Sequence, residues 1–409
     1  MKKNNIKDSI WNALGLTLNS FNSFFFLLAV RYINGLDIAG IFTYAFAVCA
    51  LLYFVSTYFN RSFQVSTSDK DFSFNDYLSC RLILSIVTIL VLILFSIINQ
   101  FSNLEILILL SLLSFRLIES ISDCFYGAIH KHSKLYQTGI SLSIKAILGL
   151  AAFVIVDYFT HNLPLAIASI TIINLLIFFI YDYRAYRKLA LDKITFTTKN
   201  LKKLLKTCFP IFFFSALSLF LVNCQKYVMP YFESDEAQTI FGILIMPATI
   251  VSLAGSYLVN PILNTATEHF KAHNFKAYIL LTKKILSLLV AFAAFATGFC
   301  YFFGIPILNF IYNLDLSNYQ LQLVLVIVAA AFFAAAMIIS NLLTVIGVNA
   351  KQSYLYIFVS LISLFISVPF IQFFGISGAI YAFAISGLLL IISYIVLLQW
   401  SLHKFRSAS

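Results

Sequence analysis

Three ionisable side chains share one face of a stretch that follows an apolar run. In FRLIESISDCFYGAIHKHSK, residues 115–134, Arg116, Glu119 and Asp123 stand three and four residues apart, so a helix points them the same way. A charged group at a bilayer centre costs about 2.5–3.5 kcal/mol on the insertion scale. If these groups lie inside a membrane, we expect them to line a water-filled cavity. Arg116 would then bind an anion, with Glu119 and Asp123 as its partners or as a switch for a coupling ion.

The same charges fit a second placement, at the cytoplasmic interface, if the span ends early. If instead the span starts at Glu105, Arg116 lies near mid-membrane and Asp123 approaches the inner surface. The sequence leaves both placements open.

The composition is that of an integral membrane protein. Of the 409 residues, 61% are hydrophobic and 11% are charged, and the mean hydropathy is +0.94. A soluble domain is nearer half apolar and a quarter charged. The apolar stretches reach about twenty residues, the length of a transmembrane helix, and lack the alternation of a β-barrel. We therefore expect an all-α polytopic protein of about twelve spans, at 10–30, 38–60, 82–99, 105–125, 138–158, 163–182, 208–229, 239–261, 278–303, 320–345, 352–372 and 376–399.

The basic residues indicate the orientation of these spans. With a cytoplasmic N-terminus, most Lys and Arg fall in loops on one side, and the opposite loops carry mainly acidic residues. Lys and Arg accumulate in cytoplasmic loops. We therefore expect both termini in the cytoplasm. This asymmetry also accounts for the net charge of +11 without nucleic acid.

Further cations fall in or beside the spans. Lys145 lies in span five and Lys226 near the outer end of span seven, where a long side chain could also extend to the membrane surface. Together with Arg31, Arg61 and Arg116 they could form a cationic path for an anionic solute. Phosphate fits best, since a guanidinium binds it through two hydrogen bonds.

Span one carries a polar, small-residue stripe of Asn12, Gly15, Asn19 and Asn22. Such a stripe either packs helices together or forms a cavity wall, and both alternatives stay open. The histidines lack metal-ligand spacing, so we expect no metal site. No nucleotide-binding motif is present, and we expect no cofactor.

A long polar segment, residues 184–206, divides the spans into two sets of six. We therefore expect an N-terminal lobe at 1–200 and a C-terminal lobe at 201–409. Arg31-Tyr32 and Lys226-Tyr227 each precede an acidic outer loop, a weak trace of the internal repeats that transporters often contain.

Several segments resemble a known family. ESISDCFYGAIHKHSKLYQTGISLSIKAILGL, IFGILIMPATIVSLAGSYLVNPIL and RYINGLDIAGIFTYAFA are similar to parts of the Wzx-type flippases of O-antigen and capsule repeat units. These belong to the multidrug/oligosaccharidyl-lipid/polysaccharide (MOP) exporter superfamily. The resemblance implies two six-helix lobes around a central cavity. It also implies that Arg116, Lys145 and Lys226 contact a pyrophosphate, whereas Arg31 and Arg61 are proposed from charge position alone.

The resemblance implies a function as well. The protein would flip polyprenyl-pyrophosphate-linked oligosaccharide from the inner to the outer leaflet of the bacterial plasma membrane by alternating access. The implied partners are undecaprenyl-pyrophosphate-linked oligosaccharide, membrane lipid, a coupling ion (H⁺ or Na⁺) or the membrane potential, and other polysaccharide-assembly proteins, with no nucleic acid.

Two alternatives belong to the same superfamily. A drug or cation antiporter would have a cavity dominated by carboxylates and aromatic residues, and a peptidoglycan-precursor flippase usually has more than twelve spans. A membrane enzyme such as a polymerase needs catalytic residues in a large outer loop, and the outer loops expected here are short. We therefore expect a transporter and not an enzyme.

Overall fold

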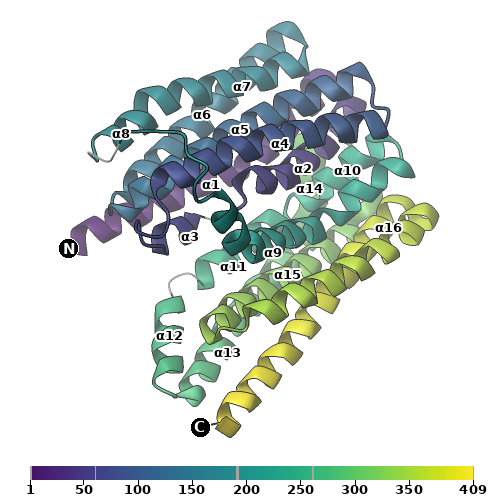
Figure 1. Cartoon of the computed structure of the whole chain (residues 1–409). Coiled ribbons are helices and arrows are strands. Elements are labelled where there is room, and N and C mark those ends of the chain that lie inside the picture. The colour runs from purple at the N-terminus through teal and green to yellow at the C-terminus, as the bar shows by residue number, and fades with distance from the viewer. Residues whose placement is uncertain (1, 60, 190–192, 260–261, 409) are drawn as a thin grey trace. The chain divides into compact units, whose positions relative to one another are not determined.

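The computed structural model describes residues 2–59, 61–189, 193–259 and 262–408, which are almost entirely helical and include no β-strand (Figure 1). The all-α class expected from the composition is confirmed. The chain divides into two compact units, Met1–Ala216 and Leu217–Ser409. The division falls inside one helix, α9 (Leu201–Val228), and lies sixteen residues after the lobe boundary expected from the sequence.

The first unit consists of helices that mostly follow the apolar stretches. In chain order they are α1 (Lys2–Asn34), α2 (Leu36–Thr57), α3 (Arg61–Ser66), α4 (Phe74–Ile98), α5 (Asn103–Lys131), α6 (Leu135–Thr160), α7 (Leu163–Ile177), the π-helical turn η1 (Phe178–Asp182) and α8 (Tyr183–Arg187). Figure 1 shows α4, α5, α6 and α7 running alongside one another. α5 packs against α2, α4 and α7, which brings its charged face among other helices.

Local capping sets where two of these helices begin. Ser73 accepts a hydrogen bond from the Asp76 backbone N–H, and the Asp76 carboxylate accepts one from the Ser73 N–H. Ser102 and Glu105 make the same reciprocal pair at the start of α5. Each pair satisfies donors that a helix start leaves without intrahelical partners.

Glycines allow α1 and α6 to pack closely in the first unit. A Cβ on Gly139 would lie 2.2 Å from the Trp11 carbonyl oxygen, and a Cβ on Gly15 would lie 2.5 Å from the Gly139 carbonyl oxygen. Asn22 Nδ2 donates to the Ala146 carbonyl oxygen at 3.3 Å across the same contact. Small residues that allow close backbone approach, and hydrogen bonds from side-chain amides, stabilise helix packing in membranes. The hydrophobic effect does not drive this packing, because lipid is itself apolar.

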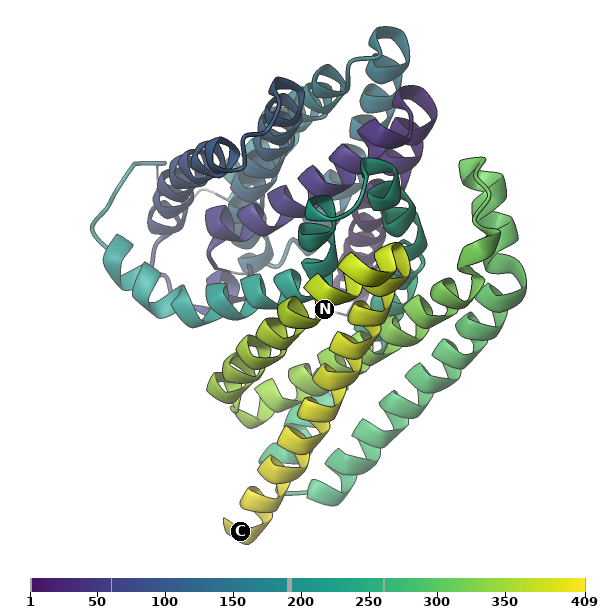
Figure 2. The same cartoon turned by 90° about the vertical axis from the view of Figure 1, so that its right-hand side faces the viewer.

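The second unit holds the remaining helices. They are η2 (Met229–Tyr231), α10 (Asp235–Ile245), α11 (Ala248–Val259), α12 (Leu263–Lys271), α13 (Phe275–Phe299), η4 (Cys300–Gly304), α14 (Ile305–Tyr312), η5 (Ser317–Tyr319), α15 (Gln320–Ile346) and α16 (Asn349–Ala408). α13 and α15 pack together and lie side by side in Figure 2.

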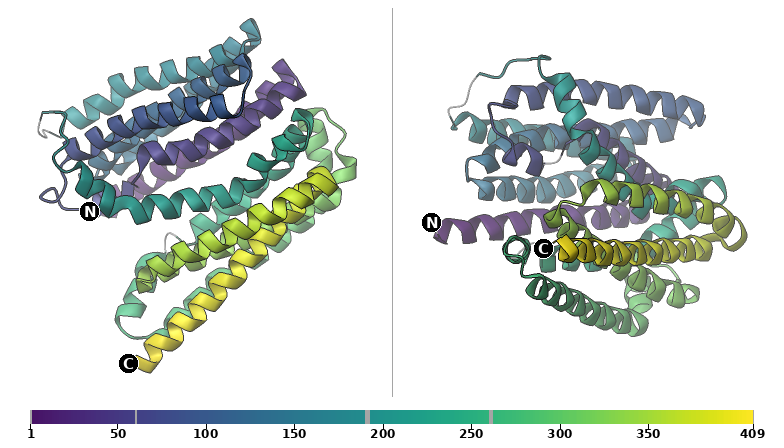
Figure 3. Two further views of the ribbon diagram at one scale, coloured as in Figure 1. Left: turned by 45° about the vertical axis from the view of Figure 1, so that its right-hand side comes forward. Right: turned by 60° about the horizontal axis from the view of Figure 1, so that its bottom comes forward.

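α16 is two helices joined by a sharp turn at Gly375, whose φ of 56° suits glycine. The two arms fold back on one another, as Figure 3 shows. Ser386 Oγ on the second arm donates to Ser363 Oγ on the first at 2.7 Å, and Ser367 on the first arm is bonded to Gln225 of α9. Hydrogen bonds between uncharged side chains thus join these helices of the second unit.

The helix inventory agrees with a multi-pass membrane protein. Within the described ranges, ten segments are long and apolar enough to cross a membrane, and one of them, Lys351–His403, contains both arms of α16. α5 is not among the ten, because it carries Glu105, Arg116, Glu119 and Asp123. If the two arms of α16 are counted separately and α5 is added to the ten segments, the described residues contain twelve such helices, the number expected from the sequence.

Candidate functional site

A cavity of about 180 Å³ lies inside the first unit, among α1, α2, α3, α5, α6 and α7. Five of the residues proposed from the sequence line it, namely Asn19, Arg61, Glu119, Asp123 and Lys145. Tyr53, Tyr126 and Asn174 add aromatic and amide groups to the wall. Residues that are far apart in the sequence therefore form one polar chamber within an apolar helical unit.

Asp123 is the centre of the first charge cluster. Its Oδ1 accepts from Arg61 Nε at 2.9 Å and Nη2 at 2.6 Å, and its Oδ2 accepts from Arg81 Nη2 at 2.8 Å. Arg81 on α4 is wholly buried, its Nη1 donates to the Ser120 carbonyl oxygen, and its guanidinium lies 4.5 Å from the Phe59 ring centroid. The carboxylate is thus held by two guanidinium groups.

This arrangement corrects one expectation. Arg116 was expected to pair with both Glu119 and Asp123, but among the described residues its ion pair is with Glu119 alone, through Nη1 and Oε2 at 2.6 Å. The Arg116 guanidinium also lies 4.6 Å from the Phe46 ring centroid. Asp123 lies one turn further along α5, and its carboxylate forms ion pairs with Arg61 and Arg81. Arg116 does not line the cavity, although its partner Glu119 does.

Lys145 is the centre of the second cluster. Its Nζ donates to Asp182 Oδ2 at 2.6 Å, to Ser122 Oγ at 2.8 Å and to Tyr126 OH at 3.0 Å. The Lys145 side chain is 7% exposed and that of Asp182 is 1% exposed. Lys145 therefore does not extend to the inner membrane surface, the alternative left open by the sequence.

The two clusters and the separate Arg116–Glu119 pair together carry a small excess of positive charge. Arg61, Arg81, Arg116 and Lys145 supply four cations, and Glu119, Asp123 and Asp182 supply three carboxylates, all within 16% or less side-chain exposure except Arg61 at 22%. A buried ion pair is favourable only when its hydrogen bonds are well satisfied. The excess of one cation next to the cavity suits an anionic ligand.

The asparagine stripe of α1 is divided between its two expected roles. Asn19 lines the cavity, whereas Asn22 bonds to the backbone of α6. Asn12 also lies outside the cavity lining, and its Oδ1 is buried without a hydrogen-bond partner among the described residues.

Two proposed cations lie elsewhere. Arg31 lies in the last turn of α1, outside the cavity lining. Its buried Nε has no hydrogen-bond partner in the part of the chain that is described. Lys226 belongs to the second unit, in the last turn of α9, where its carbonyl oxygen accepts from Gln238 Nε2 at 3.2 Å. Their proposed contact with a pyrophosphate remains a prediction.

Two members of the site were not foreseen. Arg81 stands immediately before the third expected span, and Asp182 ends the sixth. The π-helical turn η1 precedes α8 and places Asp182 beside Lys145. The sequence did show that Arg81 and Asp182 are charged residues at the ends of apolar runs. It could not show which helices bring them together with Asp123 and Lys145.

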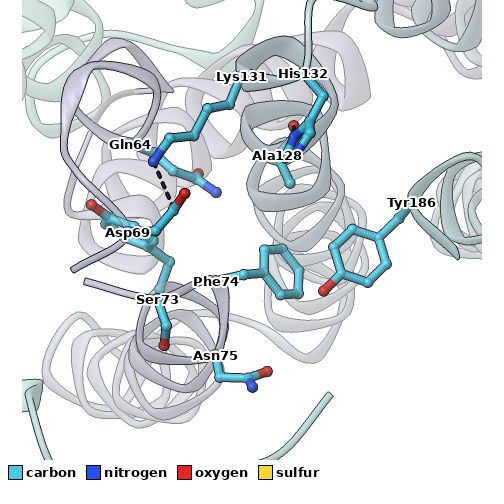
Figure 4. Close-up of a pocket in the computed structure, with 10 residues that line it drawn as sticks. Gln64, Asp69, Ser73, Phe74, Asn75, Ala128, Lys131, His132 and Tyr186 are labelled. Atoms are coloured by element: carbon cyan, nitrogen blue, oxygen red, sulfur yellow. Dashed lines mark hydrogen bonds and ion pairs between the residues drawn. The ribbon is translucent and has the colours of Figure 1, made fainter. Parts of the chain in front are cut away.

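A second pocket, of about 230 Å³, lies among α3, α4, α5 and α8 (Figure 4). The ion pair drawn there joins Lys131 Nζ and Asp69 Oδ1 at 2.7 Å, and Lys131 also donates to the Thr67 carbonyl oxygen. Phe74 and Tyr186 line the pocket together, with ring centroids 4.4 Å apart. The charges of the lining residues balance in both places, but the cavity around Lys145 has two further cations beside it, Arg81 and Arg116, against one further carboxylate, Asp182, so it is the stronger candidate for an anion site.

Comparison with known proteins identifies one curated relative. The capsular polysaccharide biosynthesis protein CapF of Staphylococcus aureus is 24% identical over 382 residues, which cover 92% of this chain and 95% of CapF. No family model matches the sequence.

Solved structures resemble the chain over nearly its whole length. The lipid II flippase MurJ in an inward closed conformation has a TM-score of 0.67 at 15% identity, covering 99% of this chain and 90% of MurJ. An outward-facing multidrug resistance MATE transporter of the MOP superfamily has a TM-score of 0.63 at 15% identity, covering 100% of this chain and 97% of its own.

These comparisons confirm the resemblance noted in the sequence. The named proteins are a flippase, a multidrug transporter and a capsule biosynthesis protein. The chain is a multi-pass membrane protein with the fold of the MOP superfamily transporters and has a homologue in capsule biosynthesis.

Proposed function

We propose that the protein flips polyprenyl-pyrophosphate-linked oligosaccharide from the inner to the outer leaflet of the bacterial plasma membrane, for capsule or O-antigen synthesis. The observation that carries this proposal is the cavity lined by Arg61 and Lys145, with one cation in excess of the surrounding carboxylates. The similarity to CapF, a capsular polysaccharide biosynthesis protein, and to the lipid II flippase MurJ supports the same class of cargo.

The cavity offers donors suited to a pyrophosphate. Arg61 uses Nε and Nη2 on Asp123, which leaves Nη1 for a ligand, and Lys145 contributes its ammonium to the lining from α6. Phosphate oxygens form short, strong hydrogen bonds with guanidinium and ammonium groups. We place the pyrophosphate between Arg61 and Lys145.

The rest of the wall suits a sugar. Tyr53 and Tyr126 present aromatic rings, and Asn19 and Asn174 present amides that both donate and accept hydrogen bonds. The sugar nearest to the pyrophosphate would lie against these groups, while the apolar polyprenyl chain stays in the surrounding lipid. Each compact unit is proposed to form one lobe of an alternating-access transporter.

The coupling ion is part of the proposal. Glu119 and Asp123 line the cavity, and both are proposed to respond to a proton or another cation as the cargo moves. The membrane potential adds a force, since an anion moving outward gains about 2.3 kcal/mol per charge for each 100 mV. Both chain termini are proposed to lie in the cytoplasm because the basic loops fall on their side.

A strain lacking the gene provides the test. It is expected to accumulate lipid-linked oligosaccharide in the inner leaflet and to lose surface polysaccharide, and the wild-type gene should restore both. Lys145→Ala and Arg61→Ala should fail to restore them at normal protein level. Lys131→Ala, which alters a cation outside the cavity, is the matched control and should restore both.

Two results would reject the proposal. One is full surface polysaccharide in the deletion strain, and the other is full complementation by Lys145→Ala. A drug or cation antiporter, the alternative suggested by the MATE neighbours, would instead leave polysaccharide intact and change resistance to cationic compounds. A peptidoglycan-precursor flippase would make the deletion strain arrest in cell-wall synthesis.

A further inference from the structure

Only two of the four clustered cations can meet an anion that enters the cavity. Arg61 and Lys145 line it, whereas Arg81 and Arg116 do not. Each of the two lining cations already holds a carboxylate, Asp123 for Arg61 and Asp182 for Lys145. An anion that binds Lys145 therefore competes with Asp182, because all three N–H donors of Lys145 are in use, and an anion that draws more than the free Nη1 from Arg61 also competes with Asp123.

The competition affects the two carboxylates differently. If Arg61 turns toward an anion, Asp123 still keeps Arg81, which is bonded to its other oxygen at 2.8 Å. Among the described residues Asp182 has no second cation, because its one ion pair there is with Lys145. Its remaining contact is a hydrogen bond from Tyr126 OH at 3.3 Å, and its buried Oδ1 has no partner in the described part of the chain.

We propose that Asp182 is a proton-coupling residue, which takes up one proton when an anionic cargo draws Lys145 away. This inference rests on the proposed function and specifies how the cargo site is linked to protons. In the empty cavity Asp182 is ionised and paired with Lys145. When the anion binds the Lys145 ammonium, one proton from water enters the cavity and binds Asp182, whose carboxylate becomes a neutral carboxyl group.

The physical reason is the cost of an unpaired charge in a dry site. An isolated carboxylate in a low-dielectric interior is so unfavourable that it is neutralised by protonation. Asp182 is 1% exposed, so water does not replace Lys145 as a partner. The neutral carboxyl group can donate its new proton, and Tyr126 OH, 3.3 Å from Oδ2, can accept it.

The groups around Asp182 do not offer a substitute for Lys145. The elements packed against η1 are α5, α6, α7 and α8. Tyr126 on α5 and Lys145 on α6 are hydrogen-bonded to Asp182, α8 carries Arg184 and Arg187 with Tyr183 and Tyr186, η1 itself carries Tyr181, and α7 contributes no ionisable group. Arg184 and Arg187 are exposed. The carboxylate of Glu119 interacts electrostatically with Lys145.

The proposal fixes the sign of a pH effect on binding. Because the bound state carries one more proton than the empty state, the affinity for the anion rises as the pH falls. One linked proton changes Kd by up to about tenfold per pH unit. Removing the carboxylate also removes the competitor, so Asp182→Asn should bind the anion more tightly than the wild type at high pH and lose that pH dependence.

The experiment uses the purified full chain in lipid nanodiscs with inorganic pyrophosphate as the probe. Calorimetric titration in two buffers of different ionisation enthalpy gives both Kd and the number of protons taken up. We expect the wild type to take up close to one proton more per bound pyrophosphate than Asp182→Asn does. The probe's own titration is the same in both proteins and cancels in this difference.

Asp157→Asn is the matched control. Asp157 is another fully buried carboxylate of the first unit, on α6, but it bonds to Asn34 and lies outside the cavity lining. It should keep the wild-type proton uptake. Equal uptake in the wild type and Asp182→Asn, with binding intact, would overturn the coupling role alone.

Lys145→Ala separates this inference from the proposed function. If the wild type does not bind pyrophosphate, or if Lys145→Ala binds it equally well, the proposed cargo site fails. If Asp182→Asn does not fold, difference infrared spectroscopy of the wild type decides the question. Pyrophosphate should then produce the carbonyl band of a newly protonated carboxyl group, and the absence of this band would refute the proposal.

Discussion

Arg81 and Asp123 form an ion pair across α4 and α5 in which the arginine side chain is wholly buried, with Nη2 2.8 Å from Oδ2. The same carboxylate binds Arg61 through its other oxygen. The pair therefore does two things at once. It joins two helices of the first unit, and it keeps the charge of Asp123 compensated whatever Arg61 binds.

Replacing Arg81 should destabilise the first unit. Arg81→Met removes a buried partner of Asp123 and should lower the free energy of unfolding by about 3 kcal/mol, the lower end for breaking a buried pair, because Arg61 remains bound. Thermal unfolding of the purified protein measures the change. Asp69→Ala is the control, since Asp69 is 73% exposed and its pair with Lys131 should contribute about 1 kcal/mol or less. Equal losses in both variants would contradict the structural role of Arg81.

Arg61 and Arg116 should differ in their effect on cargo binding. Arg61 lines the cavity, whereas Arg116 is held by Glu119 and lies against Phe46 outside the lining. A hydrogen bond to a charged group contributes about 1.5–3 kcal/mol. Arg61→Ala should therefore weaken pyrophosphate binding by about ten- to a hundredfold, and Arg116→Ala by clearly less. Calorimetric titration of both variants measures this, and an equal or larger loss for Arg116→Ala would place the anion on the Arg116 side.

Asp123 and Glu119, the two carboxylates proposed as a switch, should differ in their effects on stability and transport. Asp123→Asn leaves Arg61 and Arg81 without their shared anion, so it should lower both stability and transport. Glu119→Gln affects Arg116, which retains its contact with Phe46, so stability should fall less. Transport measured with and without an imposed proton gradient tests the coupling role. If neither variant changes that dependence, neither carboxylate couples transport to protons.

The sequence predicted the helices well because their cause is local. A run of about twenty apolar residues has few ways to satisfy its backbone in lipid other than a helix. The capping pairs at Ser73 and Ser102 are local as well. The spacing of Arg116, Glu119 and Asp123 correctly indicated a shared helix face, and Arg116 and Glu119 do pair.

The cavity could be predicted only in part because its cause is not local. Asp123 was assigned to Arg116 by helix spacing, but Arg61 and Arg81 approach it from other helices. Likewise, Asp182 reaches Lys145 through the packing of α6 on α7 and η1. A single sequence gives the positions of charges along each helix, but the choice between two partners depends on which helices meet.

The glycine contact between α1 and α6 should be intolerant of added volume. A Cβ on Gly139 would lie 2.2 Å from the backbone oxygen of Trp11, and backbone cannot turn aside as a side chain can. Gly139→Ala should therefore separate the two helices and destabilise the protein by about 1–3 kcal/mol. Gly298→Ala in α13 is the control, since nothing lies within 4 Å of its Cβ. Thermal unfolding should show a loss for the first variant only, and an unchanged Gly139→Ala would contradict the close packing.

The orientation of the chain can be tested with two single cysteines. Ser133 follows α5 in a basic loop proposed to be cytoplasmic, and Ser317 follows α14 in a loop proposed to face outward; both are exposed. Five of the six native cysteines are buried, so the variants are best made after Cys300, which is partly exposed, is replaced by Ser. A membrane-impermeant maleimide should label Ser317→Cys in intact spheroplasts and Ser133→Cys only after permeabilisation. The opposite result would invert the topology and place the excess of basic residues outside, against the usual charge distribution of membrane proteins.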